Sequence, residues 1–362
     1  MAAERDWEAI RDLCTRFIPA QAAPARPADV LRELAARAED DRGDVYGRGG
    51  PVERLETRVA ELLGKEAALL FPSGTMGQQA ALRIWSDRAG SRSVAFHPQC
   101  HLEAHEEKAY EWLHGLHAEL VGHRERLVTL DDLEGISGAL AALLLELPQR
   151  DLGGQLPEWD DLVAQTEWAR SRGTALHLDG ARLWQCEPFY SRTFAEIAAL
   201  FDSVYVSLYK DLGGLGGCLL AGAADMVDEA RVWRIRHGGR VASLYPYALS
   251  GERGLDEVLP LMPSFVERAR EIGAALAGID GVHVVPDPPV AAMLHVYVPG
   301  ELERIRDAVA EIAEELAVFV GFFAPTAVSR LQRAELNVGA RTLEVPADEV
   351  GELYAELVRR AA

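Results

Sequence analysis

One lysine of this chain lies where burial would change its chemistry. The 362 residues contain three lysines, and Lys210 ends the apolar, β-branched run Ser203–Tyr209 directly before a glycine-rich turn. A lysine at the inner end of a buried strand loses hydration, so its ammonium gives up a proton more readily. The neutral amine can then attack a carbonyl carbon. For Lys210 taken alone, a strand-end lysine that reaches solvent is the alternative.

Three small residues have the pattern of an anion site. Ser73, Gly74 and Thr75 follow an apolar strand and lead into a helix that we predict over Gln78–Trp85. Unpaired backbone N–H groups and the helix dipole attract a phosphate to such a helix start. An ordinary helix cap is the alternative for this turn.

A carboxylate and a histidine follow two other predicted strands. Asp179 comes directly after Ala175–Leu178, where a side chain points into the ligand crevice of an open α/β sheet. There it could pair with a protonated ring nitrogen, with Arg182 beside it, although a helix cap is the alternative. His101, in the loop after Ser93–Phe96, could stack on a planar ligand or exchange a proton, unless it is only a hydrogen-bonded loop residue.

Other histidines crowd the region around His101, namely His97, His105, His114 and His117. They are interleaved with helical turns and lack a matching set of carboxylates, so we predict no metal site. The four cysteines form no C-x-x-C pair, and neither a zinc site nor a disulfide framework is indicated.

In chain order the features are an anion-binding turn, a loop histidine, a strand-end aspartate and a strand-end lysine. Together they meet the requirements of pyridoxal 5′-phosphate: a phosphate cradle, a ring-stacking group, a carboxylate for the pyridine nitrogen and an amine for the aldehyde. A Rossmann dehydrogenase is disfavoured, because the glycines within 213–217 do not follow the G-x-G-x-x-G spacing.

The elements that must position these residues alternate along the chain. Helical stretches separate predicted strands at Ala67–Phe71, Ser93–Phe96, Ala141–Leu145, Ala175–Leu178 and Ser203–Leu208. This alternation predicts a mostly parallel sheet with helices on both faces. We predict an N-terminal arm (1–25), a large cofactor-binding domain (26–248) and a small C-terminal α/β domain (249–362) with a long helix over Gly254–Leu276.

Composition limits the classes of partner. The formal net charge is −20 and no basic run is present, so neither a nucleic acid nor an anionic membrane is expected to bind. No window approaches 18 uninterrupted apolar residues, and the N-terminus has no apolar core of signal-peptide length. We therefore expect a cytoplasmic protein.

The sequence resembles the threonine aldolase and β-eliminating lyase family of fold-type-I pyridoxal-phosphate enzymes. The matching segments are DVYGRGGPVERLE (44–56), LLGKEAALLFPSGTMGQQAAL (62–82), HLDGARLW (177–184) and SLYKDLGGLGGCLLAG (207–222). The resemblance implies the fold-type-I transferase-like α/β architecture, with helices on both sides of the main sheet. It also implies a homodimer or homotetramer with active sites at the subunit boundary.

The resemblance implies roles for the matching residues around the cofactor. Lys210 would bind the cofactor aldehyde covalently, and Asp179 would pair with the pyridine nitrogen. Arg182 would neighbour the ring hydroxyl or the substrate carboxylate. His101 would stack on the ring, and Glu106 matches the family's glutamate five residues after that histidine. The implied phosphate contacts are Ser73, Gly74, Thr75 and Ser207, with Arg240 as a further candidate.

Two arginines compete for the substrate in the C-terminal domain. Arg333 best matches the family's carboxylate-binding arginine, and Arg330 is its close rival. A guanidinium suits an α-carboxylate because it donates two parallel hydrogen bonds.

One departure from the family concerns acid–base chemistry. Gln149 occupies the place of a second histidine, and a glutamine cannot take up or deliver a proton at neutral pH. Either another base serves, such as His101, His105 or a water, or the reaction differs.

The leading hypothesis is reversible retro-aldol cleavage of a β-hydroxy-α-amino acid to glycine and an aldehyde. The first alternative is β-elimination or β-replacement on a serine- or cysteine-like amino acid, which needs a base at Cα and fits Gln149 without strain. The second is a non-catalytic relative that only binds pyridoxal phosphate. The retention of Lys210 and Asp179 argues against that relative.

Overall fold

The computed structural model of the protein describes residues 5–23, 25–38 and 41–362. Its internal contacts divide the chain into two units. The large unit comprises Leu31–Asp151 and Leu156–Pro260, and the C-terminal unit comprises Met1–Val30, Leu152–Gln155 and Leu261–Ala362. The domain boundaries that we predicted after residues 25 and 248 remain a prediction.

The large unit is built on one seven-stranded sheet of order β2-β8-β7-β6-β5-β3-β4. Its strands are β2 (Ala67–Phe71), β3 (Ser93–Phe96), β4 (His117–Leu120), β5 (Ala142–Glu146), β6 (Ala175–Gly180), β7 (Ser203–Ser207) and β8 (Cys218–Gly222). Only β8 runs antiparallel to its two neighbours, and all other neighbouring pairs are parallel. The predicted mostly parallel sheet is therefore confirmed.

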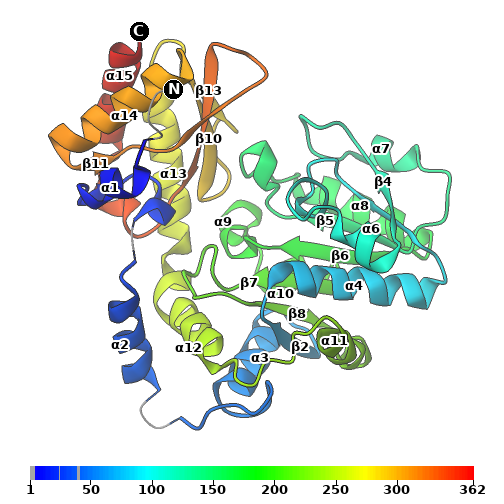
Figure 1. The fold of residues 1–362 in the computed structure, drawn as a ribbon. Coiled ribbons are helices and arrows are strands. Elements are labelled where there is room, and N and C mark those ends of the chain that lie inside the picture. Colours follow the sequence, from blue (N-terminus) through cyan, green and yellow to red (C-terminus); the bar gives the residue numbers. More distant parts are fainter. Residues whose placement is uncertain (1–4, 24, 39–40) are drawn as a thin grey trace. The chain divides into compact units, whose positions relative to one another are not determined.

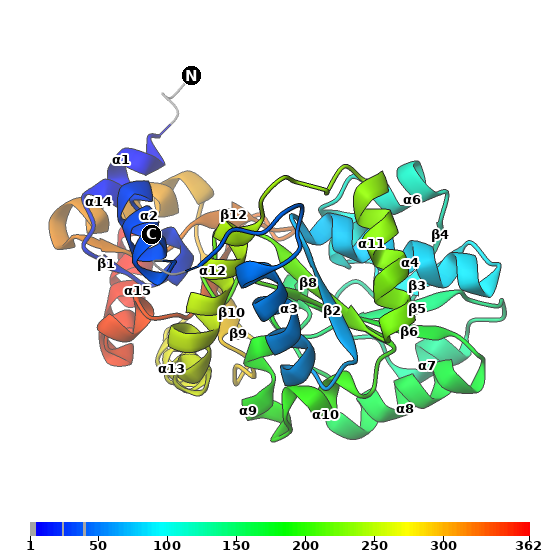
Figure 2. The same cartoon turned by 90° about the horizontal axis from the view of Figure 1, so that it is seen from below.

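Helices cover both faces of this sheet, as Figures 1 and 2 show. Helices α4 and α11 lie on one side, and α8 and α10 lie on the other (Figure 2). The helices of this unit are α3 (Gly50–Leu62), α4 (Gly74–Ala89), α5 (His101–Ala104), α6 (Ala109–His114), α7 (Leu130–Glu134), α8 (Trp159–Ser171), α9 (Glu187–Tyr190), α10 (Phe194–Ala198), α11 (Ala224–Arg236) and α12 (Tyr245–Arg253). Helix α2 (Pro27–Arg37) crosses the boundary between the units.

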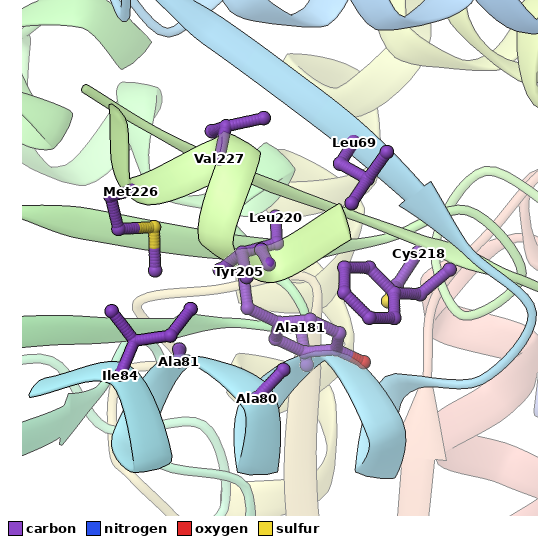
Figure 3. Close-up of a cluster of buried hydrophobic side chains, with 12 residues drawn as sticks. Leu69, Ala80, Ala81, Ile84, Ala181, Tyr205, Cys218, Leu220, Met226 and Val227 are labelled. Carbon is purple, nitrogen blue, oxygen red and sulfur yellow. The ribbon is translucent and has the colours of Figure 1, made fainter. Parts of the chain in front are cut away.

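A core of apolar side chains fixes α4 and α11 against the sheet (Figure 3). Ile84 from α4, Leu220 from β8 and Val227 from α11 are all at most 1% exposed. Burying one such side chain contributes about 1.5–3 kcal/mol. Because Tyr205 of β7 belongs to the same core, the start of α4 is held close to the end of β7.

The C-terminal unit contains a four-stranded sheet of order β12-β13-β10-β9 and a two-stranded parallel pair, β1-β11. Its strands are β1 (Arg16–Phe17), β9 (His283–Val285), β10 (Met293–Pro299), β11 (Val318–Phe319), β12 (Phe323–Pro325) and β13 (Leu331–Asn337). Its α-helices are α1 (Trp7–Asp12), α13 (Met262–Ala277), α14 (Leu302–Leu316) and α15 (Ala347–Ala361). Nowhere in the described ranges does a helix combine the length and apolarity needed to cross a bilayer.

The prediction of one continuous helix over Gly254–Leu276 is wrong. A π-helical turn at Gly254–Val258 and a 3-10 turn at Leu259–Leu261 come first, and α13 begins only at Met262. Prolines explain the break, because a proline lacks the N–H that a continuous helix needs and fits best in the first helical turn. Pro260 lies in the 3-10 turn and Pro263 in the first turn of α13.

Candidate active site

The carboxyl ends of β5, β6 and β7 bring the predicted site residues to one edge of the sheet. In register, Glu146 pairs with Asp179, and Asp179 pairs with Tyr205. Residues opposite each other on neighbouring strands point to the same face, so these three side chains share the face that α4 covers. Lys210 follows β7 by three residues, in the crevice that such strand ends form.

Lys210 is held by a compact turn. The Ser207 hydroxyl accepts hydrogen bonds from the backbone N–H groups of Tyr209 and Lys210, each at 3.3 Å. The glycines that follow allow the chain to pass close by, since a Cβ on Gly214 would lie 2.7 Å from the Leu208 carbonyl oxygen. Burial, and then the charge of Arg182, lower the pKa of Lys210, while Asp179 and Glu146 oppose that shift. An amine with a lowered pKa is the nucleophile expected here.

Asp179 is oriented by two donors. Asp179 is only 1% exposed. The Gln78 amide donates to Oδ2 at 2.6 Å, and the backbone N–H of Ala181 donates to Oδ1 at 3.0 Å. A buried carboxylate fixed in this way suits a cationic ring nitrogen, because charged groups in an interior need a partner.

A buried chain of polar side chains supports Gln78, and sequence reasoning missed it. His177 Nε2 lies 3.3 Å from Gln78 Oε1, and His177 Nδ1 lies 2.8 Å from the Ser203 hydroxyl. The Trp85 indole also donates to Ser203 at 2.8 Å. Burial lowers the pKa of His177 to about 4, so this ring is neutral and structural at pH 7. The signal was available, because His177 is two residues before Asp179 on one strand and therefore shares its face.

The predicted anion turn begins a helix of 16 residues, α4. Ser73 is its N-cap, and its hydroxyl accepts from the Met76 N–H at 3.3 Å. Gly74 is needed for packing, since a Cβ there would lie 2.4 Å from the Tyr205 hydroxyl oxygen. The turn thus presents helix N-terminal N–H groups and the hydroxyls of Ser73 and Thr75, a donor set that suits a phosphate.

His101 is the first residue of α5 and is paired with a buried carboxylate. Its Nδ1 lies 3.0 Å from Glu106 Oε1, and the other Glu106 oxygen accepts from the Gln79 amide at 3.3 Å. A carboxylate on one ring nitrogen fixes the orientation of the imidazole, as a ring that stacks on a flat ligand requires. The predicted pair of His101 and Glu106 is brought together.

Arg182 lies in the turn after β6 and is largely buried. Its Nε is 4.0 Å from Asp211 Oδ1, which also accepts from the Gln185 amide at 2.8 Å. Burial raises the pKa of Asp211 to about 6, although Arg182, Gln185 and Lys210 favour its charged form. Arg182 therefore adds positive charge beside Lys210 at the sheet edge.

Gln149 is buried and contacts Glu146 at the end of β5. Its amide donates to Glu146 Oε2 at 3.0 Å and to the Gln99 carbonyl oxygen at 3.3 Å. The other Glu146 oxygen accepts from the Arg150 N–H at 3.0 Å. Burial, and then the charge of Asp179, raise the pKa of Glu146 well above its usual range. Gln149 thus fixes a carboxyl group next to Asp179, a contact that sequence reasoning did not foresee.

Three predicted arginines remain. Arg240 is exposed and its guanidinium lies over the Tyr46 ring, 4.5 Å from the ring centroid. Arg333 is on β13 and Arg330 directly precedes that strand, so both belong to the C-terminal unit. Their roles toward a phosphate and a substrate carboxylate stay predictions.

A mostly parallel sheet with a lysine, a buried aspartate and a helix N-terminus at its carboxyl edge defines a pyridoxal-phosphate enzyme of fold type I. The sequence model of the β-eliminating lyase family matches residues 24–298, and the chain belongs to that family. The chain is thus a pyridoxal-phosphate-dependent lyase of the threonine aldolase and β-eliminating group.

Several relatives carry threonine aldolase names. The chain is 29% identical over 271 residues to low-specificity L-threonine aldolase 1 of Arabidopsis thaliana, covering 72% of this chain and 75% of the relative. It is 31% identical over 265 residues to the low specificity L-threonine aldolase of Escherichia coli K12, covering 69% and 78%. A solved Listeria monocytogenes structure, provisionally assigned as an L-allo-threonine aldolase, matches with a TM-score of 0.92 at 37% identity over 98% of both chains.

The cofactor is pyridoxal 5′-phosphate, and the residues present fit it. The start of α4 offers phosphate donors, Asp179 offers a buried carboxylate for the ring nitrogen, and Lys210 offers an amine of lowered pKa. His101, paired with Glu106, offers a flat ring beside them.

Proposed function

We propose that this enzyme cleaves β-hydroxy-α-amino acids into glycine and an aldehyde, or joins them in the reverse direction. The observation that carries the proposal is the meeting of Lys210, Asp179 and the start of α4 at one sheet edge, in a chain whose relatives are named threonine aldolases. When bound, the cofactor would withdraw the electron pair that the breaking Cα–Cβ bond leaves at Cα.

The residues of the chain would bind the cofactor and orient the substrate. Lys210 would hold the cofactor aldehyde until substrate arrives, and Asp179 would keep the ring nitrogen protonated. Ser73, Gly74, Thr75 and Ser207 would hold the phosphate, with Arg240 as a further contact. Arg333, or its rival Arg330, would bind the substrate carboxylate so that the bond to be broken has a defined orientation. Arg182 would neighbour the ring hydroxyl or that carboxylate.

The test is product formation by the purified, cofactor-loaded enzyme. Incubation with threonine, allo-threonine and phenylserine should yield glycine together with acetaldehyde or benzaldehyde in equal amounts. If none of the three yields glycine, the proposed aldol cleavage is refuted.

The second candidate is β-elimination from a serine- or cysteine-like amino acid. Gln149 favours it, because that buried amide cannot accept a hydroxyl proton and β-elimination needs no such base. Release of pyruvate and ammonia from serine or cysteine analogues, without glycine from the aldol substrates, would establish this reaction instead.

We further propose a homodimer or homotetramer, on the family resemblance. Light scattering or native mass spectrometry of the full chain gives the assembly directly, and a monomer that retains full activity would contradict it.

A further inference from the structure

We propose that His105, held by Asp151, takes the β-hydroxyl proton of the substrate during aldol cleavage. This inference rests on the proposed function and names the base for the same site. It concerns a histidine and a carboxylate that are 46 residues apart in the chain and meet beside the carboxyl edge of the sheet.

The two side chains form a close pair. His105 Nε2 lies 2.7 Å from Asp151 Oδ2, and the histidine side chain remains 38% exposed while the aspartate is 13% exposed. A carboxylate on one ring nitrogen sets the tautomer and leaves the other nitrogen to accept a proton, as in acid–base dyads of hydrolytic enzymes. Among the described residues, no group hydrogen-bonds His105 Nδ1, so this nitrogen is the one that substrate can use.

The pair lies next to the cofactor site. The His105 and His101 ring centroids are 5.2 Å apart, and Arg150 Nη1 is 3.4 Å from His105 Nε2. The charge of Arg150 also lowers the pKa of Lys210, with a smaller effect than burial and the charges of Arg182, Asp179 and Glu146. His105 is therefore a neighbour of the histidine expected over the ring and of Arg150.

The buried carboxylates at this edge are already occupied by donors. Both oxygens of Glu146 accept hydrogen bonds, from the Gln149 amide and the Arg150 N–H. Both oxygens of Asp179 likewise accept, from the Gln78 amide and the Ala181 N–H. Neither carboxylate is therefore placed to take a proton from a substrate hydroxyl.

His101, the neighbouring histidine, already has a hydrogen-bond partner and an expected role. His101 uses Nδ1 for Glu106 and is expected to lie flat on the cofactor ring. His105 has no expected stacking role, and its side chain is the more exposed of the two, at 38% against 28% for His101.

The proposed step is balanced within the substrate and the histidine. The hydroxyl proton passes to His105 Nδ1, the O–H electron pair forms the carbonyl of the aldehyde, and the Cα–Cβ bond breaks with its electron pair left at Cα. Cα then takes up one proton from solvent to become glycine, and His105 gives its proton to solvent. Asp151 stabilises the cationic ring while it holds the proton, which makes Asp151 a positioning residue.

The experiment compares H105A and D151N with the unaltered holoenzyme. For allo-threonine cleavage, H105A should lose about 100-fold in kcat with little change in KM, because a positioned base contributes about 10²–10⁴-fold. D151N should lose about tenfold. Exchange of the glycine α-proton in deuterated water needs no β-hydroxyl base, so H105A should keep it within about twofold. Added imidazole should restore part of the cleavage by H105A.

A second readout needs no turnover. In protein without cofactor, ¹⁵N NMR should find the His105 ring protonated on Nε2 in the unaltered chain and a mixture of tautomers in D151N. H117A is the matched control, since His117 is an exposed histidine on β4 outside the site, and it should match the unaltered enzyme.

The outcomes separate this inference from the proposed function. Glycine from the unaltered enzyme together with unimpaired cleavage by H105A overturns only the role of His105. Loss of α-proton exchange in parallel with cleavage in H105A also overturns it, because the histidine would then act on Cα or on the fold. Absence of glycine from the unaltered enzyme overturns the proposed function and this inference with it.

Discussion

Asp179 and Gln78, 101 residues apart in the chain, are joined by a hydrogen bond of 2.6 Å between Gln78 Nε2 and Asp179 Oδ2. Gln78 lies in the first turns of α4, the helix whose start is the predicted phosphate site, and Asp179 lies near the end of the central strand β6. One side chain thus connects the two ends of the expected cofactor site. Since His177 meets the other atom of the same amide, the orientation of Gln78 is fixed from both sides.

This connection predicts the effect of removing the amide. Q78A should lower kcat about tenfold and weaken cofactor binding, because Asp179 would keep only the Ala181 N–H and could turn away from the ring nitrogen. Steady-state kinetics with cofactor titration measure both effects. Q165A is the control, since Gln165 is another buried amide of the large unit and donates to the Val128 carbonyl oxygen at 2.9 Å rather than to Asp179. Equal losses in the two variants would mean that Q78A acts only through stability.

Lys210 should carry the cofactor covalently. Borohydride reduction of the holoenzyme, followed by peptide mapping, should place the label on Lys210, and K210A should take up no label there. Cleavage by K210A should fall by several orders of magnitude, because neither of the other two lysines follows β7 at the sheet edge. K108A is the control, since Lys108 is a half-exposed residue in an ion pair with Glu103 at 2.9 Å. Full turnover by K210A would contradict the assignment.

The start of α4 gives a prediction about close packing. G74A should weaken cofactor binding about tenfold or more, because its Cβ would lie 2.4 Å from the Tyr205 hydroxyl oxygen and the helix start would have to move. Y205F removes that oxygen, and the nearest ring carbon would then lie 3.0 Å away, so the double variant should recover part of the loss. A double-mutant cycle on cofactor affinity measures the coupling. Strictly additive losses would show that Tyr205 is not the obstacle.

Much of the site could be predicted from the sequence because its signals are local. The bounds of β2 and β3 match the predicted strands, and the polar residues that end β6 and follow β7 lie at one sheet edge because parallel strands end together. The antiparallel insertion of β8 between β2 and β7 could not be predicted, since pairing order depends on distant residues. For the same reason the contacts of Gln78 with Asp179 and of His105 with Asp151 required the structure.

A buried carboxyl group predicts how stability depends on pH. Burial raises the pKa of Glu56 to about 7, although the Leu70 N–H donates to its Oε1 at 2.8 Å. A carboxyl whose pKa is raised by folding holds its proton more tightly in the folded state. Its contribution to stability is therefore complete below its unfolded pKa and is lost as pH rises toward 7. E56Q keeps the acceptor for Leu70 without the charge, so it should remove this part of the pH dependence.

The size of that effect follows from the shift. The free energy of unfolding of the unaltered chain should fall relative to E56Q between about pH 4.5 and about pH 7, by about 2–3 kcal/mol in total. Urea unfolding at several pH values measures it, and E61Q, at another exposed glutamate of α3, serves as the control. If the free energy of unfolding changed equally with pH in the unaltered chain and in E56Q, the raised pKa of Glu56 would be contradicted.

The two candidate arginines of the C-terminal unit differ in how firmly the fold holds them. Arg333 is on β13, between β10 and β12, where its backbone pairs with Tyr297 on one side and Ala324 on the other. Arg330 is exposed and precedes the strand, and its carbonyl accepts from the Gly300 N–H at 3.0 Å. Two parallel hydrogen bonds to a carboxylate require a guanidinium of fixed orientation, which a lysine cannot replace. R333K should therefore raise KM for the amino acid about tenfold or more while leaving kcat less affected.

R330K is the matched variant and should change neither constant more than about twofold. Binding of glycine to the holoenzyme, followed by the absorbance of the cofactor, measures the same preference without turnover. A larger loss of glycine affinity in R330K than in R333K would assign the substrate carboxylate to Arg330.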